Sequence, residues 1–175
     1  MISTVPAITM SEMEENPEKW ERFEMYKGEA VEMTYTKPAH GRILLKLGSI
    51  ILDWIRKNGY GEVYGGESGI KFNDQTRYSF DLGWSDTALP EDEIPTKSLP
   101  LMVEIVSDSN DAGLLLTKIE DYLEYGAREV WIVYPKRKSI QVYYPDRTAR
   151  IFHEQEIIIP GNWMREFQIK PGDLF

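Results

Sequence analysis

The sequence contains no cysteine among its 175 residues. Disulfides, thiolate metal sites and cysteine nucleophiles are therefore excluded, and nothing in the composition requires an oxidising compartment. The chain also lacks a basic N-terminal region followed by an apolar run, and no segment reaches the roughly 18 apolar residues of a membrane span. We therefore expect a cytoplasmic location and no membrane partner.

Positively charged residues are fewer than negatively charged ones in this chain. Lys and Arg number 20 against 29 Asp and Glu, which gives a formal net charge of -9. Because nucleic-acid affinity comes mainly from Lys and Arg neutralising phosphates, this balance argues against a surface that coats nucleic acid broadly. It leaves room for a local basic groove. An acidic site for Mg²⁺ or Mn²⁺ is consistent with it, although a solvated acidic surface explains most such excesses.

Hydrophobic residues are plentiful, at 42% of the chain with five Trp and ten Tyr. A chain of this length and composition can bury a substantial core, so disorder is not expected. No repeat, low-complexity tract or long linker divides the sequence. We therefore predict a single domain over residues 1–175.

The first third of the chain predicts a short helix, a hairpin and a long helix. Thr9 and Glu12 form a capping pattern for a helix that ends before Pro17. The segment 23–34 alternates and breaks at Lys27-Gly28, which indicates a hairpin. Residues 38–58 predict the long helix, closed by Asn58-Gly59. Its apolar face holds Ile43, Leu44, Leu47, Ile50, Ile51, Trp54 and Ile55.

The rest of the chain predicts strands around a second helix. Segments 61–72, 78–84 and 101–107 are bounded by turn residues, and the last is apolar enough to be a central strand. A helix over 112–125 would turn Leu115, Leu116, Ile119, Tyr122 and Leu123 inward. Segments 130–134 and 140–144 predict two strands of a hairpin that are joined by a turn at 135–138. The tail to Phe175 is typical of further short strands. This order predicts an α/β fold with a central mixed sheet flanked by helices and additional hairpins.

Two carboxylates interrupt segments that are otherwise apolar or aromatic. Glu104 lies inside the run 101–106, where an ionised carboxylate is costly unless it is paired, hydrogen-bonded or bound to a cation. Asp81 lies inside the aromatic segment 78–84. If the two strands are neighbours, both carboxylates could serve as hard oxygen ligands for Mg²⁺ or Mn²⁺.

Lys118 lies on the helix that follows Glu104, where its long stem can cover apolar surface while its ammonium reaches the strand ends. Two carboxylates, a cation and a metal suit phosphodiester hydrolysis, with Lys118 positioning a water or stabilising negative charge. Ordinary structural explanations stay open. Asp81 is also compatible with a solvated turn, and Lys118 with an ion pair to Glu104 or a contact with Asp121 or Tyr122.

The order and spacing of these residues resemble a known family. The resemblance rests on Phe23 to Glu29, Pro38 to Ile43, Phe80-Asp81-Leu82, Val103 to Ser107, Lys118, Tyr122, Gly126 and Glu129 to Pro135. This set, which covers most of the chain, is similar to the Uma-two family of restriction-endonuclease-like proteins in the PD-(D/E)XK nuclease superfamily.

The resemblance implies a restriction-endonuclease-like fold, a divalent cation and hydrolysis of nucleic acid, with DNA as the expected partner. Asp81 and Glu104 match the metal-binding acids, and the backbone carbonyl of Ile105 is a further candidate ligand. Lys118 matches the relocated lysine, since Val106 occupies the usual lysine position. Acidic residues of the first hairpin are matched by Glu29 and less closely by Glu24, and His40 matches a histidine at the start of the long helix.

Two departures from the family pattern concern the same site. Phe80 replaces the proline that often precedes the aspartate, while the carboxylate itself is retained. Leu114 stands where many relatives carry aspartate, with Asp108 and Asp111 nearby. The second departure keeps open a nucleic-acid-binding or regulatory protein that has lost turnover.

Other residues indicate partner surfaces. Lys37, Arg42 and Lys46 could contact a nucleic-acid backbone, although an ordinary solvated helix face explains them as well. His40 follows Pro38-Ala39 at a helix start, where it could bind phosphate, orient a water or act as a cap. A self-associating structural protein is the third reading, because Trp163, Phe167 and Phe175 look exposed. By analogy with nucleases that cut both strands, we expect a homodimer or higher homo-oligomer.

Overall fold

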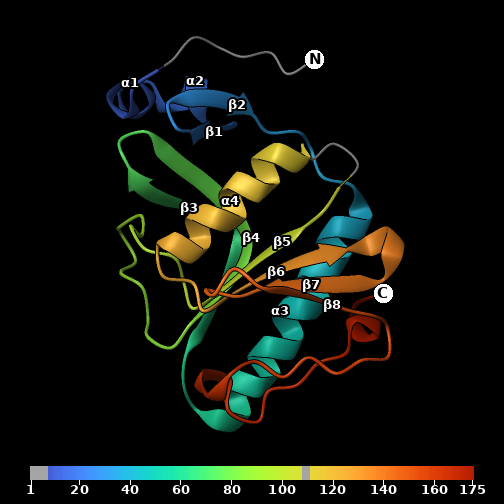
Figure 1. Ribbon diagram of the computed structural model, residues 1–175. Helices are drawn as coiled ribbons and strands as arrows, with labels where there is room; N and C mark the ends of the chain where they lie inside the picture. Colours follow the sequence, from blue (N-terminus) through green and yellow to red (C-terminus); the bar gives the residue numbers. More distant parts are fainter. Residues whose placement is uncertain (1–7, 108–110) are drawn as a thin grey trace.

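A mixed sheet of eight strands forms the centre of the protein (Figure 1). The computed structural model describes residues 8–107 and 111–175. The strands are β1 (Phe23–Tyr26), β2 (Glu29–Glu32), β3 (Glu62–Asn73), β4 (Thr76–Ser85), β5 (Leu101–Ile105), β6 (Glu129–Tyr134), β7 (Ser139–Tyr143) and β8 (Ala149–Phe152). Their order is β2-β1-β4-β5-β6-β7-β8, and β3 pairs with β4 off this path. The pairing of β5 with β6 is parallel, and the other pairings are antiparallel.

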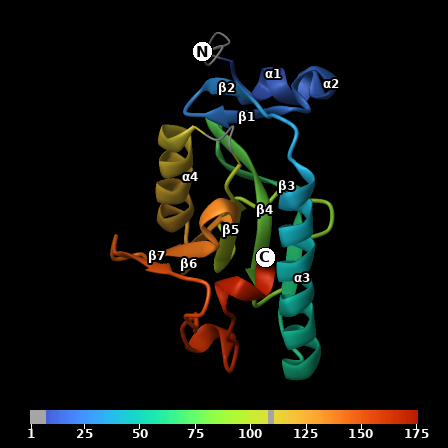
Figure 2. The same ribbon diagram turned by 90° about the vertical axis from the view of Figure 1, so that its right-hand side faces the viewer.

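The two long helices cover opposite faces of this sheet, as Figure 2 shows. The helices are α1 (Met10–Glu15), α2 (Pro17–Trp20), α3 (Pro38–Asn58) and α4 (Ala112–Glu124), with short 3₁₀ turns η1 (Pro135–Arg137), η2 (Asn162–Met164) and η3 (Pro171–Leu174). This arrangement confirms the predicted α/β architecture of a mixed sheet between helices. No helix in the described part of the chain is long and apolar enough to cross a membrane.

The ends of the first helices follow from local chemistry. The Thr9 side chain accepts from the Glu12 amide while the Glu12 carboxylate accepts from the Thr9 amide, so the predicted capping box is confirmed. Helix α3 has the predicted bounds. It ends because Gly59 takes the left-handed conformation, with φ +74°, and its amide donates to the Ile55 carbonyl.

The core has two layers, one on each face of the sheet. On the α3 face, Leu47, Ile51 and Trp54 pack with buried strand residues such as Trp84 and Trp131. On the α4 face, the packed residues include Ile119, Tyr122, Phe80, Met102 and Ile132. Consecutive residues of β5 and β6 alternate between the two layers, as the pleat of a strand requires.

Three details differ from the sequence-based expectations. Leu116 is exposed, because α4 turns Lys118, Ile119, Asp121 and Tyr122 inward instead. After β8 the tail forms 3₁₀ turns and one isolated bridge, Ile158 to Ile169, rather than more strands. Phe167 is buried, and Trp163 and Phe175 are partly buried against the α3-side core, so the expectation that these three rings are exposed is wrong.

Two different strands, β1 and β5, pair with successive parts of one edge of strand β4. Along one edge it pairs with β3 over most of its length. Along the other it pairs with β1 at Arg77 and with β5 from Leu82 to Trp84. The residues between, 78–81, therefore lie where β1 leaves the sheet and β5 joins it. Side chains from several elements meet at this junction.

Candidate active site

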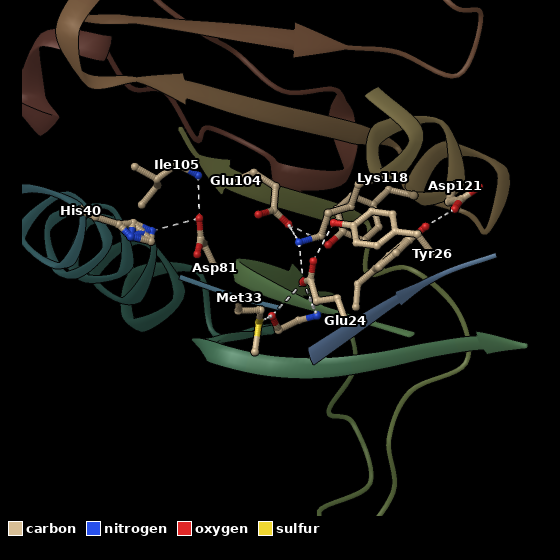
Figure 3. A network of polar contacts seen from close by, with 12 residues as sticks. Glu24, Tyr26, Met33, His40, Asp81, Glu104, Ile105, Lys118 and Asp121 are labelled. Atoms are coloured by element: carbon tan, nitrogen blue, oxygen red, sulfur yellow. Dashed lines mark hydrogen bonds and ion pairs between the residues drawn. The ribbon is translucent and has the colours of Figure 1, made fainter. Parts of the chain in front are cut away.

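Asp81 lies at the β1/β5 junction on β4. Its Oδ2 accepts a hydrogen bond of 2.7 Å from the backbone amide of Ile105 on β5, which ties the carboxylate to the neighbouring strand (Figure 3). The Asp81 side chain is 16% exposed, so it is largely buried but still reached by solvent. The explanation of Asp81 as a solvated turn residue is therefore wrong.

Glu104 projects from β5 toward the α4 face. The alternation of β5 places Met102 in the α4-side core and Val103 and Ile105 in the α3-side core, so Glu104 shares the face of Met102. Its Oε1 accepts a hydrogen bond of 2.7 Å from the Tyr122 hydroxyl, and Tyr122 is fully buried on α4. The predicted adjacency of the strands that carry Asp81 and Glu104 is confirmed.

Lys118 brings a buried cation to the same point from α4. Its Nζ lies 3.1 Å from Glu104 Oε1 and 2.9 Å from Glu24 Oε1, and the lysine is only 6% exposed. The ammonium also lies 5.7 Å from the centre of the Tyr78 ring, within cation–π range. Lys118 therefore pairs with two carboxylates rather than with Asp121 or the Tyr122 hydroxyl.

Glu24 on β1 is a full member of the cluster (Figure 3). Its Oε1 accepts from the Ser79 amide and hydroxyl, both at 2.9 Å, and its Oε2 accepts from the Tyr26 hydroxyl at 2.6 Å. The Ser79 amide belongs to the part of β4 between its β1 and β5 pairings, so Glu24 replaces a missing strand partner there. The family resemblance had favoured Glu29 over Glu24 as the acidic residue that the hairpin contributes to the site.

The carboxylates respond differently to their burial. Burial raises the pKa of the Glu104 carboxyl to about 8, since Lys118 offsets only part of the cost and Asp81 and Glu24 add negative charge. Burial likewise raises the pKa of Asp81 despite the Ile105 hydrogen bond and the nearby Lys118. For Glu24, burial is outweighed by Lys118 and the hydrogen bonds, so its pKa lies below its usual range.

The cation and the hydroxyls keep their protons. Burial lowers the pKa of the Lys118 ammonium, but Glu104 and Glu24 more than reverse this and raise it above its ordinary value. Burial and the nearby carboxylates raise the pKa of the hydroxyls of Tyr26 and Tyr122. Lys118 is therefore a permanent positive charge at neutral pH, and the two tyrosines act as hydrogen-bond donors.

Asp121 is a further buried acid next to this cluster. Asp121, one helical turn after Lys118, is buried and accepts a hydrogen bond from the Tyr78 hydroxyl. Burial and this hydrogen bond raise the pKa of Tyr78, so the hydroxyl stays the donor. The pair holds the Tyr78 ring near Lys118. Nothing in the sequence pattern distinguished Asp121 from the solvated acids of α4.

His40 reaches the other side of Asp81 from the first turn of α3. Its Nε2 lies 3.1 Å from Asp81 Oδ2, yet the direction does not suit a hydrogen bond, and neither ring nitrogen has a hydrogen-bond partner among the side chains that the structure describes, which leave out that of Glu67. The imidazole is buried. A buried ring with unused nitrogens next to a carboxylate is a candidate contact for a water or a phosphate.

Other predicted site residues lie elsewhere. Glu29 is exposed at the start of β2, opposite Tyr26 at the turn end of the hairpin, and makes none of the contacts that hold the cluster together. Lys46 donates to the Phe175 backbone oxygen at 3.0 Å, so its ammonium serves the packing of the tail. Lys37 and Arg42 are exposed, and they lie three residues before and two residues after His40 in the chain.

The departure at Leu114 has a structural explanation. Leu114 is partly buried and packs against the α4-side core, whereas Asp111 caps α4 by accepting from the amides of Gly113 and Leu114. Neither residue adds a carboxylate to the cluster. Asp108 lies outside the described residues.

The donor set fits a divalent cation. Asp81 and Glu104 are hard oxygen donors on adjacent strands that a divalent cation could use, and their raised pKa values reflect buried negative charge that a cation would relieve. No group of three or more His, Asp or Glu side chains poised to hold a metal occurs among the described residues. Mg²⁺ commonly uses one or two carboxylates together with water and substrate phosphate, so two protein carboxylates are sufficient.

The chain is similar to known proteins over most of its length. Residues 10–172 match the Uma2 family model, described as a putative restriction endonuclease. A crystal structure of a putative nuclease belonging to DUF820, from Anabaena variabilis, matches with a TM-score of 0.83 at 19% sequence identity, over 96% of this chain and 97% of that chain. At this identity the likeness shows the fold. No curated protein matches the sequence.

The family model bears out the resemblance carried by the spaced motifs of the sequence, and it spans well over half of the chain. This protein therefore belongs to the Uma2 family of putative restriction endonucleases.

Proposed function

We propose that this protein is an endonuclease that depends on Mg²⁺ or Mn²⁺ and hydrolyses phosphodiester bonds in DNA. The observation that carries the proposal is that Lys118 on α4 pairs with Glu104 on β5 at 3.1 Å, while Asp81 on the adjacent strand β4 is close enough for its charge to interact with both. Membership of the Uma2 family agrees with a nuclease activity.

Asp81 and Glu104 would hold the cation, together with the backbone carbonyl of Ile105. A divalent ion bound there supplies neutralisation of phosphate charge and a lowered pKa for a bound water. The Tyr122 hydroxyl fixes one oxygen of Glu104, which leaves the orientation of this carboxylate determined before any ion arrives. The Ile105 amide does the same for Asp81.

Lys118 would stabilise negative charge on the phosphoryl oxygens. Because its ammonium is held protonated by Glu24 and Glu104, it serves as an electrostatic stabiliser and not as the base that accepts the proton of water. Glu24 is a positioning residue, since it holds Lys118 in place. His40, beside Asp81, would orient a water or contact the phosphate.

The proposal is tested with supercoiled DNA and Mn²⁺ or Mg²⁺. Asp81→Asn and Glu104→Gln keep side-chain shape and remove charge, and each should lower the cleavage rate at least about a hundredfold. Lys118→Met should do the same if its fold survives. Asp92→Asn and Glu91→Gln are matched controls on an exposed loop and should cleave normally. Circular dichroism checks folding, and calorimetry with Mn²⁺ checks metal binding.

Cleavage that survives the Asp81 and Glu104 substitutions would refute the assigned site. A wild-type protein that binds DNA with Mn²⁺ present but never cleaves it would favour the second candidate, a nucleic-acid-binding protein without turnover. Leu114 favours that candidate specifically, because a packed apolar side chain stands where relatives place an acid.

A homodimer in the cytoplasm completes the proposal, because cutting both strands of a duplex requires two sites. Sedimentation analysis at micromolar concentration should give a species of twice the 20.3 kDa chain mass. A monomer under these conditions would restrict each encounter to a single-strand cut.

A further inference from the structure

The exposed ring of Tyr35 stacks on the Arg22 guanidinium group near the candidate site. Tyr35 is 87% exposed, although it is a large side chain with an apolar face. The Arg22 guanidinium carbon lies 3.7 Å from the centre of the Tyr35 ring. Arg22 also donates a hydrogen bond of 2.8 Å to the Met33 carbonyl, so the guanidinium is held in place beneath the ring. Arg22 therefore orders a ring that the core does not cover.

The chain places this Arg22–Tyr35 pair on the rim of the site. The Met33 amide donates to the Arg22 carbonyl, which extends the β1–β2 ladder, and Arg22 precedes Glu24 by two residues. Two residues of extended chain span about 7 Å. Met33 also accepts from the Ser79 hydroxyl through its sulfur, and Ser79 donates to Glu24. The pair is thus connected through Met33 and Ser79 to Glu24, a member of the carboxylate cluster.

The segment that carries Tyr35 continues to the other side of the site. It runs from β2 to His40 at the start of α3, as Figure 2 shows for the two elements. From Met33 to Leu52 the sequence contains no Asp or Glu but has Lys37, Arg42 and Lys46, in a chain of net charge -9. Lys46 is bonded to the Phe175 backbone oxygen, so Lys37 and Arg42 are the two cations that this acid-free segment offers to an anion, although the whole protein repels one.

We infer that Tyr35, supported by Arg22, stacks on an unpaired base next to the phosphodiester in the candidate site. A base can stack on a side chain only if its face is not covered by the next base, so the inference assigns DNA with an unpaired or frayed nucleotide as the preferred substrate. It rests on the proposed nuclease function and specifies its substrate class. Aromatic stacking combined with a basic side chain is the usual means of binding single strands.

Photocrosslinking and binding to defined DNA test this inference. The probe is a short single-stranded oligodeoxynucleotide that carries 5-iododeoxyuridine, with the blunt duplex of the same sequence as comparison, in Ca²⁺ to limit cleavage. Irradiation should attach the single strand to the peptide that contains Tyr35. Tyr35→Ala should weaken single-strand binding about tenfold and leave duplex binding within about twofold.

Two variants separate stacking from other roles. Tyr35→Phe keeps the ring and should bind the single strand like the wild type. Leu45→Ala removes an apolar side chain that is 75% exposed on α3, and it should leave both affinities unchanged. Unchanged single-strand binding by Tyr35→Ala, or an equal loss on single strand and duplex, would overturn the inference.

The outcomes distinguish this inference from the proposed function. If wild-type protein cleaves DNA through Asp81 while Tyr35→Ala binds every probe normally, the stacking inference fails and the nuclease proposal stands. If Tyr35 crosslinks and selects single strands but Asp81→Asn does not alter any cleavage, the nuclease proposal fails and the base contact stands.

Discussion

Lys118 is a buried cation between two buried carboxylates, and its contacts with Glu24 and Glu104 are both within 3.1 Å. The pair of Lys118 with the low-pKa Glu24 is tolerated because each charge compensates the desolvation of the other. Removal of one charged partner leaves the other charge buried without an ion-pair partner. The cluster is therefore sensitive to single substitutions in a way that surface ion pairs are not.

Lys118→Met should lower the free energy of unfolding by about 3–5 kcal/mol, since it strands the low-pKa Glu24 carboxylate in the interior. Glu24→Gln combined with Lys118→Met should recover part of the loss. Denaturant titration measures both. As a control, Lys138→Met breaks an exposed pair with Glu154 and should cost less than about 1 kcal/mol. Equal losses for Lys118 and Lys138 would contradict the buried-pair argument.

Glu104 makes stability depend on pH. Its pKa is about 8 in the folded protein against an ordinary 4.5, so between these values the folded state holds a proton that the unfolded state has lost. This contribution is fully present below about pH 4.5 and is lost as the pH rises through 8. In metal-free buffer with chelator, Glu104→Gln should therefore gain stability relative to wild type between pH 5 and 8, by a few kcal/mol at most. A pH-independent difference in unfolding free energy would contradict this.

Sequence reasoning predicted Asp81 and Glu104 because each breaks an apolar or aromatic pattern, and it predicted Lys118 from its place on the following helix and from the family resemblance. It could not choose Glu24 over Glu29, since both lie in one hairpin and the choice depends on how β1 docks. The pairing of Met25 with Arg77 sets that docking, and it is a contact between distant segments. Asp121 was missed for the same reason, because its partner Tyr78 lies on another element.

At the scale of elements, the site depends on the close approach of β4 and β5. Gly83 lies opposite Met102 where the two strands pair, and a Cβ at this position would lie 2.9 Å from Leu99 Cδ2 and 3.2 Å from the Leu101 carbonyl oxygen. The absence of a side chain is what lets the strands meet here. The same strands carry Asp81 and Glu104.

Gly83→Ala should therefore lower the free energy of unfolding by about 1–3 kcal/mol, because the Leu99 side chain must move and the Leu101 carbonyl must yield to the added methyl group. Gly48→Ala is the matched control. In α3 its added methyl would only touch Leu82 Cδ1 at 3.7 Å, and a helix interior prefers Ala to Gly, so stability should rise by about 0.5–1 kcal/mol. Thermal unfolding of the two variants in parallel checks the opposite signs.

Most elements could be predicted because their periodicity and end signals agree. Helix α3 is the best example, with an apolar stripe and a Gly59 stop that match the structure residue for residue. Leu116 was assigned to the wrong face because α4 buries Lys118 and Asp121, which a hydrophobic pattern treats as solvent-facing. The tail escaped prediction since its 3₁₀ turns η2 and η3 are too short to show a period.

At the scale of the whole molecule, acidic charge and nucleic-acid binding oppose each other. The net charge of -9 repels DNA, so binding must come from a small basic area. Arg22, Lys37 and Arg42 are the basic residues nearest the rim in the chain. Composition alone predicted that any basic groove would be local, but it could not locate it.

Affinity for single-stranded DNA should consequently show a weak salt dependence. Three phosphate contacts on a single strand correspond to a slope of about -2 in a plot of log affinity against log salt. Fluorescence anisotropy over a salt series measures the slope. Arg42→Gln should reduce its magnitude by about 0.7, whereas Lys46→Gln, which loses a contact to Phe175 instead, should leave it unchanged. A slope several times steeper would indicate a much broader basic surface.

The ion pair of Lys118 with Glu24 joins residues that are 94 positions apart in the chain. A contact of such high sequence separation forms only after most of the intervening loop entropy has been lost, so it belongs to the late, slow part of folding. A nascent or misfolded chain would consequently lack the assembled cluster. The hydrolysis proposed for this site would then appear only in molecules that have completed their fold.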